Sequence, residues 1–144
     1  MWAQLGSNQR SSDYELYSLL KMIPGIGPLT SSALITELGD INRFKNIDQL
    51  GSYVGLIPRI RESGKITHTG GITFRCNTFL QTLLIESSWQ AIRMDPAMMQ
   101  YYHKHLVNNT GNKVIIKVTR KLLNRIRYVI KKQAIILKRY GIRK

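Results

Sequence analysis

A serine in a basic, glycine-containing loop is the residue whose surroundings best suit chemistry on a phosphodiester. Ser63 precedes Gly64 in "YVGLIPRIRESGK", within a few positions of Arg59, Arg61 and Lys65. A hydroxyl that attacks phosphorus needs close approach, which glycine permits, and nearby cations that offset the phosphate charge. Because serine–glycine pairs are also common in ordinary turns, the spacing alone leaves open that Ser63 is a turn residue.

A second stretch, "IPGIGPL", places two glycines between prolines and before an apolar run. We interpret it as the turn of a helix-hairpin-helix element. Gly25 and Gly27 permit positive φ and a close backbone approach, and Ile26 is expected to turn into the core. The free N–H groups at the start of the following helix suit a phosphate oxygen. The alternative is an ordinary turn between two helices that binds no ligand.

The C-terminal part predicts one long amphipathic helix, Lys113–Tyr140. On a helical wheel, apolar residues gather on one side and cations on the other. The apolar side holds Ile115, Val118, Leu122, Leu123, Ile126, Val129, Ile130 and Leu137, with Val114 and Ile135 as exceptions. The basic side holds Lys117, Arg120, Lys121, Arg125, Arg127, Lys131, Lys132, Lys138 and Arg139. We expect this uninterrupted positive face to contact nucleic acid, chiefly through Lys117, Arg120, Lys121 and Arg125, or else an acidic partner domain.

Capping residues and turn residues predict the other elements, and the fold class is mainly α. The predicted helices are Tyr14–Met22 after an Asp13 cap, Leu29–Leu38, Ile47–Val54 after Asn46 or Asp48, Thr78–Arg93 after Asn77, and Pro96–Val107 after Asp95. On the helix after Asn77, one side is expected to hold Phe79, Leu80, Leu83, Leu84, Ser87 and Ala91. An irregular glycine-rich loop, Gly55–Thr73, interrupts the helices. Residues 1–12 are predicted to be a linker or a truncated end, and residues 13–144 one domain with the helix-hairpin-helix element at 14–38.

The overall charge favours a polyanionic partner. The 144 residues carry 22 Lys and Arg against 8 Asp and Glu, a net charge of +14, and no acidic residue follows Asp95. Such a basic, one-sided distribution is typical of nucleic-acid binding. No apolar run is long enough to span a membrane, and the single cysteine, Cys76, fits a reducing cytoplasm.

The order of several motifs resembles a known family of recombinases. "IPGIGPLTSSALITELGDINRF", "YVGLIPRIRESG", "GGIT", "LIESSW", "MDP" and "RKLLNRI" are similar to the C-terminal domain of DEDD-type insertion-sequence transposases. This is the insertion-sequence one-hundred-ten group, which is related to pilin-gene inverting recombinases. The resemblance covers Tyr14 to about Tyr128. It implies that Ser63 is the nucleophile that joins covalently to DNA, inside a DNA-contacting loop.

The resemblance also implies a second, acidic half. In the family, an N-terminal RuvC-like domain holds Mg²⁺ with four acidic residues, and a structured guide RNA pairs with DNA. The eight carboxylates of this chain are scattered, so we expect no cofactor here and Mg²⁺ only in the RuvC-like half. After "GGIT" the chain departs from the family pattern at Phe74, Cys76 and Gln81, where two cations and a glycine are expected, and Arg75 is the nearby substitute.

These patterns together predict the DNA-binding, nucleophile-bearing domain of a transposase, inactive as this fragment alone. The expected partners are DNA, a guide RNA, the RuvC-like half and a second copy of the chain. Two alternatives remain open: a non-catalytic helix-hairpin-helix module of a repair or recombination factor, and a protein-docking domain.

Overall fold

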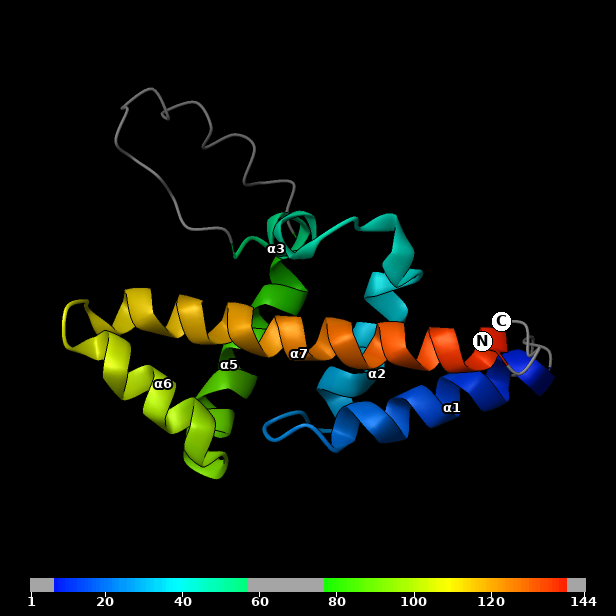
Figure 1. The fold of residues 1–144 in the computed structure, drawn as a ribbon, viewed down its shortest axis with the longest axis horizontal. Coiled ribbons are helices and arrows are strands. Elements are labelled where there is room, and N and C mark those ends of the chain that lie inside the picture. Colours follow the sequence, from blue (N-terminus) through cyan, green and yellow to red (C-terminus); the bar gives the residue numbers. More distant parts are fainter. Residues whose placement is uncertain (1–6, 57–76, 140–144) are drawn as a thin grey trace, which may run out of the picture.

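Most of the other elements pack against the long helix α7 (Gly111–Arg139), as Figure 1 shows. This computed structural model describes residues 7–56 and 77–139, with side chains over 13–56 and 77–134. The other elements are α1 (Ser7–Lys21), α2 (Pro28–Leu38), the short 3-10 helix η2 (Ile41–Arg43), α3 (Ile47–Val54), α5 (Thr78–Met94) and α6 (Pro96–Leu106). The predicted mainly α fold is confirmed, and no strand occurs within the described ranges.

The helices surround α7 from several directions. α5 crosses α7, α6 returns along the first half of α7, and α1 lies along its second half (Figure 1). α3 and η2 contact α7 from another side, and α2 packs between α1 and α5. None of the helices in the described part of the chain is long and apolar enough to cross a membrane.

Side-chain caps start three of the helices where the sequence predicts them. The Asn46 side chain accepts a hydrogen bond from the Gln49 N–H at 2.9 Å, and the Asn77 side chain accepts one from the Leu80 N–H at 3.0 Å. The Asp95 side chain accepts a hydrogen bond from the Ala97 N–H at 3.0 Å. Each oxygen satisfies a backbone donor that has no partner inside its own helix.

The predicted start of the first helix is wrong. α1 begins at Ser7, so Asp13 lies inside the helix and does not cap it. The residues before Asp13 are mostly polar and show no apolar period, but Gln9 and Arg10 have good helix propensity. The helix can therefore extend over these residues without an apolar period.

The apolar side of α7 forms the centre of the core. Ile115, Val118, Leu122, Leu123, Ile126 and Ile130 are buried there, as predicted, and Val129 is partly buried. Val114 does not depart from this pattern, because it is fully buried as well. On α5, the prediction for Phe79 is wrong, since its side chain is 53% exposed while Leu80 and Leu84 are buried.

The start of α5 is tied to α2 and α3 by polar side chains. The Asn77 amide donates to Glu37 Oε1 at 2.8 Å, and its backbone N–H donates to the Tyr53 carbonyl at 2.8 Å. The amide of Gln81, one of the departures from the family pattern, donates to the Gly55 carbonyl at 2.9 Å. Gln81 therefore connects the start of α5 to the end of α3.

Candidate nucleic-acid interface

The predicted nucleophile loop lies outside the described residues. Ser63, Arg59, Arg61, Lys65 and Arg75 all belong to residues 57–76. Their assignments as nucleophile and DNA contacts therefore stay predictions. The same holds for the glycine-rich loop as a whole.

The turn between α1 and α2 is positioned by Ile26 and Gly25. Ile26 is only 5% exposed and joins the core, as predicted. Gly25 has φ +95°, a conformation that residues with a side chain rarely adopt. A Cβ at Gly25 would lie 2.5 Å from the Ser87 carbonyl oxygen and 2.9 Å from the Ala91 nitrogen. The missing side chain of Gly25 thus lets the turn pack against the backbone of α5.

Gly27 differs from Gly25 in its backbone conformation and in the space around it. Its φ is −100°, and a Cβ there would meet no atom within 4 Å. It occupies the N-cap position of α2 without a side-chain cap, and Pro28 follows at the first helical position. The N–H groups in the first turn of α2 point toward this end of the helix, where the helix dipole is positive. Of the two glycines, Gly27 is therefore the one whose surroundings are open to a ligand.

Small polar residues allow α2 and α5 to approach closely. Thr30 and Ser87 are buried, and their hydroxyl oxygens lie 3.3 Å apart. Ser88 is fully buried and donates to the Leu84 carbonyl of its own helix at 2.9 Å. The "LIESSW" motif thus supplies the contact surface of α5 for the turn and for α2.

The positive face of α7 is not uninterrupted. Arg120 pairs with Asp48 of α3 at 2.9 Å, and Arg125 pairs with Asp95, the cap of α6, at 2.6 Å. The helical wheel could not show these carboxylates, because they come from other elements that fold back onto α7. The expectation of a face free of acid is therefore wrong, although the net charge of the face stays positive.

The two ion pairs differ in their surroundings. The Asp48 side chain is 73% exposed, so water and salt weaken its attraction to Arg120. The Asp95 side chain is only 15% exposed. The hydrogen bond from Arg125 is the main cause that holds the pKa of Asp95 below its usual value, against the opposite effect of burial. The Asp95 pair is mainly structural, whereas the Asp48 pair can exchange with a ligand.

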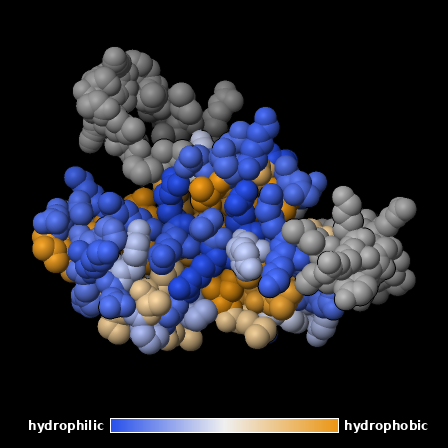
Figure 2. All heavy atoms as spheres, viewed as in Figure 1, coloured by the Kyte–Doolittle hydropathy of each residue, from blue (hydrophilic) through white to orange (hydrophobic). Residues whose placement is uncertain are grey.

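The lysines on this face of α7 remain available. Lys117 and Lys121 are exposed, and the Lys121 ammonium lies 4.7 Å from the centre of the Tyr101 ring of α6. Figure 2 shows hydrophilic side chains over much of the face along α7, with apolar side chains visible between them. Arg127 contributes less, because it is partly buried and donates to the Lys45 carbonyl at 3.3 Å.

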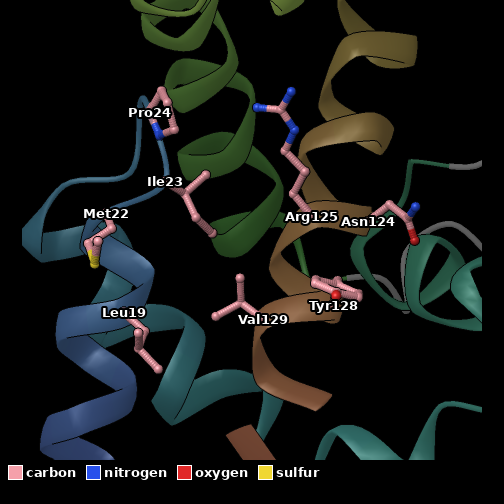
Figure 3. Close-up of a pocket in the computed structure, with 8 residues that line it drawn as sticks. All are labelled: Leu19, Met22, Ile23, Pro24, Asn124, Arg125, Tyr128 and Val129. Carbon is pink, nitrogen blue, oxygen red and sulfur yellow. The ribbon is translucent and has the colours of Figure 1, made fainter. Parts of the chain in front are cut away.

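Two grooves border this face of α7. A basic groove of about 360 Å³ lies where α3, α6 and α7 meet; its lining residues are Ile47, Tyr101, Lys117, Arg120, Lys121 and Asn124. An apolar groove of about 570 Å³ lies between α7 and the end of α1 with the following turn (Figure 3). Its lining residues are Leu19, Met22, Ile23, Pro24, Asn124, Arg125, Tyr128 and Val129.

Residues 7–56 and 77–139 contain no group of three or more side chains that could hold a metal ion. The carboxylates Asp48 and Asp95 each face an arginine of α7. These described residues do not fit the Mg²⁺ site that the family resemblance implies for its acidic half.

The sequence reasoning missed Asp48, Asp95 and Tyr101 as parts of this surface. Asp48 and Asp95 were recognised only as helix-start residues, and nothing local in the sequence pairs them with positions 72 and 30 residues further along the chain. The "MDP" motif was the one available signal for Asp95. Tyr101 carried no such signal, because a tyrosine on a helix is usually a core residue.

Comparison with known proteins assigns the family. The family model described as "Transposase IS116/IS110/IS902 family" matches residues 17–103. The chain is 38% identical over 74 residues to the "Transposase for insertion sequence element IS1111A" of Coxiella burnetii, covering 51% of this chain and 20% of that protein. It is 31% identical over 124 residues to the "Pilin gene-inverting protein" of Moraxella bovis, covering 81% of this chain and 37% of that protein.

No solved structure matches this chain. The matched segments span only about a fifth to two fifths of the length of these curated relatives. The family model nevertheless covers more than half of this chain, including the turn at Gly25 and Gly27, the α2–α5 contact and Asp95 between α5 and α6. The chain therefore belongs to the IS116/IS110/IS902 family of transposases.

Proposed function

We propose that this chain is the DNA-binding, nucleophile-bearing part of a transposase or inverting recombinase. The observation that carries the DNA-binding role is the face of α7, which keeps Lys117 and Lys121 exposed although Arg120 and Arg125 pair with carboxylates. A net charge of +14 adds a long-range attraction to a polyanion. The uncapped start of α2 at Gly27 offers a further contact for a backbone phosphate.

The chemical role is assigned to Ser63. Its hydroxyl attacks the phosphorus of one DNA strand, an Oγ–P bond forms, and the bond from phosphorus to one deoxyribose oxygen breaks. The leaving oxygen takes up the proton, so the strand end is released as a hydroxyl. Arg59, Arg61 and Lys65, close to Ser63 in sequence, offset the negative charge that develops on the phosphoryl oxygens.

The remaining parts of the reaction belong to the rest of the protein. Serine is a weak nucleophile at neutral pH and needs activation. The described residues hold no metal-binding cluster, so Mg²⁺, with the acidic RuvC-like half, is assigned outside them. A guide RNA and a second copy of the chain complete the proposed set of partners.

The test is a salt titration of DNA affinity, measured by fluorescence anisotropy with a labelled duplex. If about six phosphates are neutralised, log K against log salt falls with a slope of about −5, and changing the sequence has little effect. The double variant Lys117→Gln, Lys121→Gln reduces the steepness of the slope by roughly 2, since two cations are lost.

The matched control is Lys117→Arg, Lys121→Arg, which keeps both charges and is expected to keep the slope. A slope near zero for the unmodified chain would refute the DNA-binding role and favour the protein-docking alternative. An unchanged slope in the glutamine variant would show that DNA binds to another surface.

A further inference from the structure

The basic groove between α3, α6 and α7 combines features that duplex phosphates alone do not require. Three cations line it, but Ile47 and Tyr101 give it an aliphatic and an aromatic wall, and Asn124 adds an amide. Its volume of about 360 Å³ is near the lower end of the range for small-molecule sites, about 300–1,000 Å³. It therefore has the size of a site for one small planar group rather than for a duplex.

The Tyr101 ring is held in place from its own helix. The His105 ring lies 4.2 Å away at an angle of 41°, and His105 Nδ1 lies 3.0 Å from the Tyr101 carbonyl oxygen. Lys121 reaches across from α7 and places its ammonium 4.7 Å from the ring centre. The cation is attracted by the electron-rich face of the ring. Tyr101 thus packs against the core, yet its ring also lines the groove and is in contact with Lys121.

A nucleobase can replace Lys121 on this ring. An exposed cation–π contact favours its bound form by about 2- to 5-fold. Stacking a base on an aromatic side chain raises affinity by about 5- to 150-fold. The exchange is therefore favourable, and the displaced ammonium becomes free to pair with a phosphate.

Arg120 can make a similar exchange. It is held by Asp48, whose carboxylate is 73% exposed, and such exposed pairs favour the bound form by at most about fivefold. A phosphate carries the same charge as the carboxylate and matches the two-pronged guanidinium equally well. A nucleotide phosphate therefore competes with the Asp48 carboxylate for Arg120.

We propose that the basic groove binds a single unpaired nucleotide of DNA, with its base on Tyr101 and its phosphate between Lys117 and Arg120. This inference rests on the proposed DNA binding and adds the form of DNA that is recognised. In an intact duplex the bases are stacked and cannot reach Tyr101, so DNA with an extrahelical nucleotide is preferred. Such nucleotides arise wherever a strand is opened or exchanged.

The experiment compares two duplexes of the same sequence, one fully paired and one with a single bulged 2-aminopurine nucleotide. The whole 144-residue chain is titrated into each at equal salt. We expect at least about fivefold tighter binding of the bulged duplex, together with quenching of 2-aminopurine emission as the base stacks. Tyr101→Leu removes the preference for the bulged duplex and the quenching.

Two control variants test whether the aromatic ring of Tyr101 is needed and whether any tyrosine with a lysine over its ring would have the same effect. Tyr101→Phe keeps the ring and is expected to keep the preference. Tyr17→Leu removes a second tyrosine with a lysine over its ring, Lys21 at 4.9 Å, which lies on α1 and outside this groove. It is expected to leave both the preference and the quenching unchanged.

The possible failures are distinguishable. Equal affinity for both duplexes with unchanged 2-aminopurine emission overturns the nucleotide site and leaves the DNA-binding role standing, whether or not Tyr101→Leu folds. A preference that persists in a folded Tyr101→Leu variant also overturns it. If neither duplex binds at low salt, the proposed function fails together with this inference.

Discussion

Substitution by alanine is expected to destabilise the protein strongly at the first glycine of "PGIGP" and hardly at all at the second. Gly25→Ala places a methyl group 2.5 Å from the Ser87 carbonyl oxygen and 3.0 Å from Ala91 Cβ, on a helix that cannot move aside locally. Such overpacking costs about 1–3 kcal/mol. The φ of +95° adds about 1–2 kcal/mol for a residue with a Cβ. The free energy of unfolding should thus fall by roughly 2–5 kcal/mol, out of about 5–15 for a typical domain.

Gly27→Ala should have little effect on stability. The new methyl group meets no atom within 4 Å, and φ is −100°. The remaining cost is the replacement of glycine by alanine at an N-cap, below about 1 kcal/mol. Gly39→Ala is a matched control, because Gly39 has φ +61° but no atom within 4 Å of a Cβ. It isolates the conformational cost, roughly 1–3 kcal/mol.

The assay is urea unfolding followed by circular dichroism. With slopes of about 1–3 kcal/mol per M, the midpoint of Gly25→Ala falls by about 1 M or more, and that of Gly27→Ala is nearly unchanged. Gly39→Ala should lie between them. If Gly25→Ala and Gly27→Ala unfolded at the same midpoint, the turn would not pack against α5 as described. Substitution at Gly27 should instead affect DNA binding: Gly27→Val should lower the affinity for DNA while the protein stays folded.

Three further predictions concern single side chains. Asp95→Asn keeps the cap but loses the charge that pairs with Arg125, and should lower the free energy of unfolding at neutral pH by about 1–2 kcal/mol. Because the pKa of Asp95 is lowered from 3.8, its contribution to the free energy of unfolding is complete above that pH and is lost as the pH falls below it. The free energy of unfolding should therefore change less with pH in the variant than in the unmodified chain. Equal pH dependence in the two proteins would contradict the pairing. Asp48→Asn frees Arg120 and should tighten DNA binding by about 2- to 5-fold, with little change in melting temperature, whereas weaker binding would mean that Asp48 positions Arg120 for the ligand. Ser63→Ala, in a protein that includes the acidic half, should abolish a denaturant-resistant protein–DNA adduct and change non-covalent affinity by less than about 1 kcal/mol; an adduct that forms without Ser63 would refute the nucleophile assignment.

Local signals predicted most of the helices. Asn46, Asn77 and Asp95 each start a helix because their side chains satisfy a nearby backbone donor, which is a property of a few adjacent residues. The buried side of α7 followed from the spacing of its apolar residues. The start of α1 did not follow, because the mostly polar residues before Asp13 show no apolar period.

The candidate site was less predictable, since its chemistry depends on contacts between distant elements. Arg120 and Arg125 were correctly placed on the polar side of α7, but their partners come from α3 and from the start of α6. Likewise, the sequence around Gly25 is typical of a glycine that contacts a ligand. Only the position of α5 shows that Gly25 is a packing residue. Ser63 lies outside the described residues, so its assignment rests on the sequence alone.

The central position of α7 has a consequence for how the chain is made. Among the described elements, α7 is the last to be synthesised, yet α1, α3, α5, α6 and η2 all pack on it. A nascent chain on the ribosome therefore has no complete core until α7 has emerged, because the contacts of α1 and α3 with α7 join residues far apart in sequence. A product that ends before Gly111 should therefore be unfolded rather than a partial DNA-binding domain.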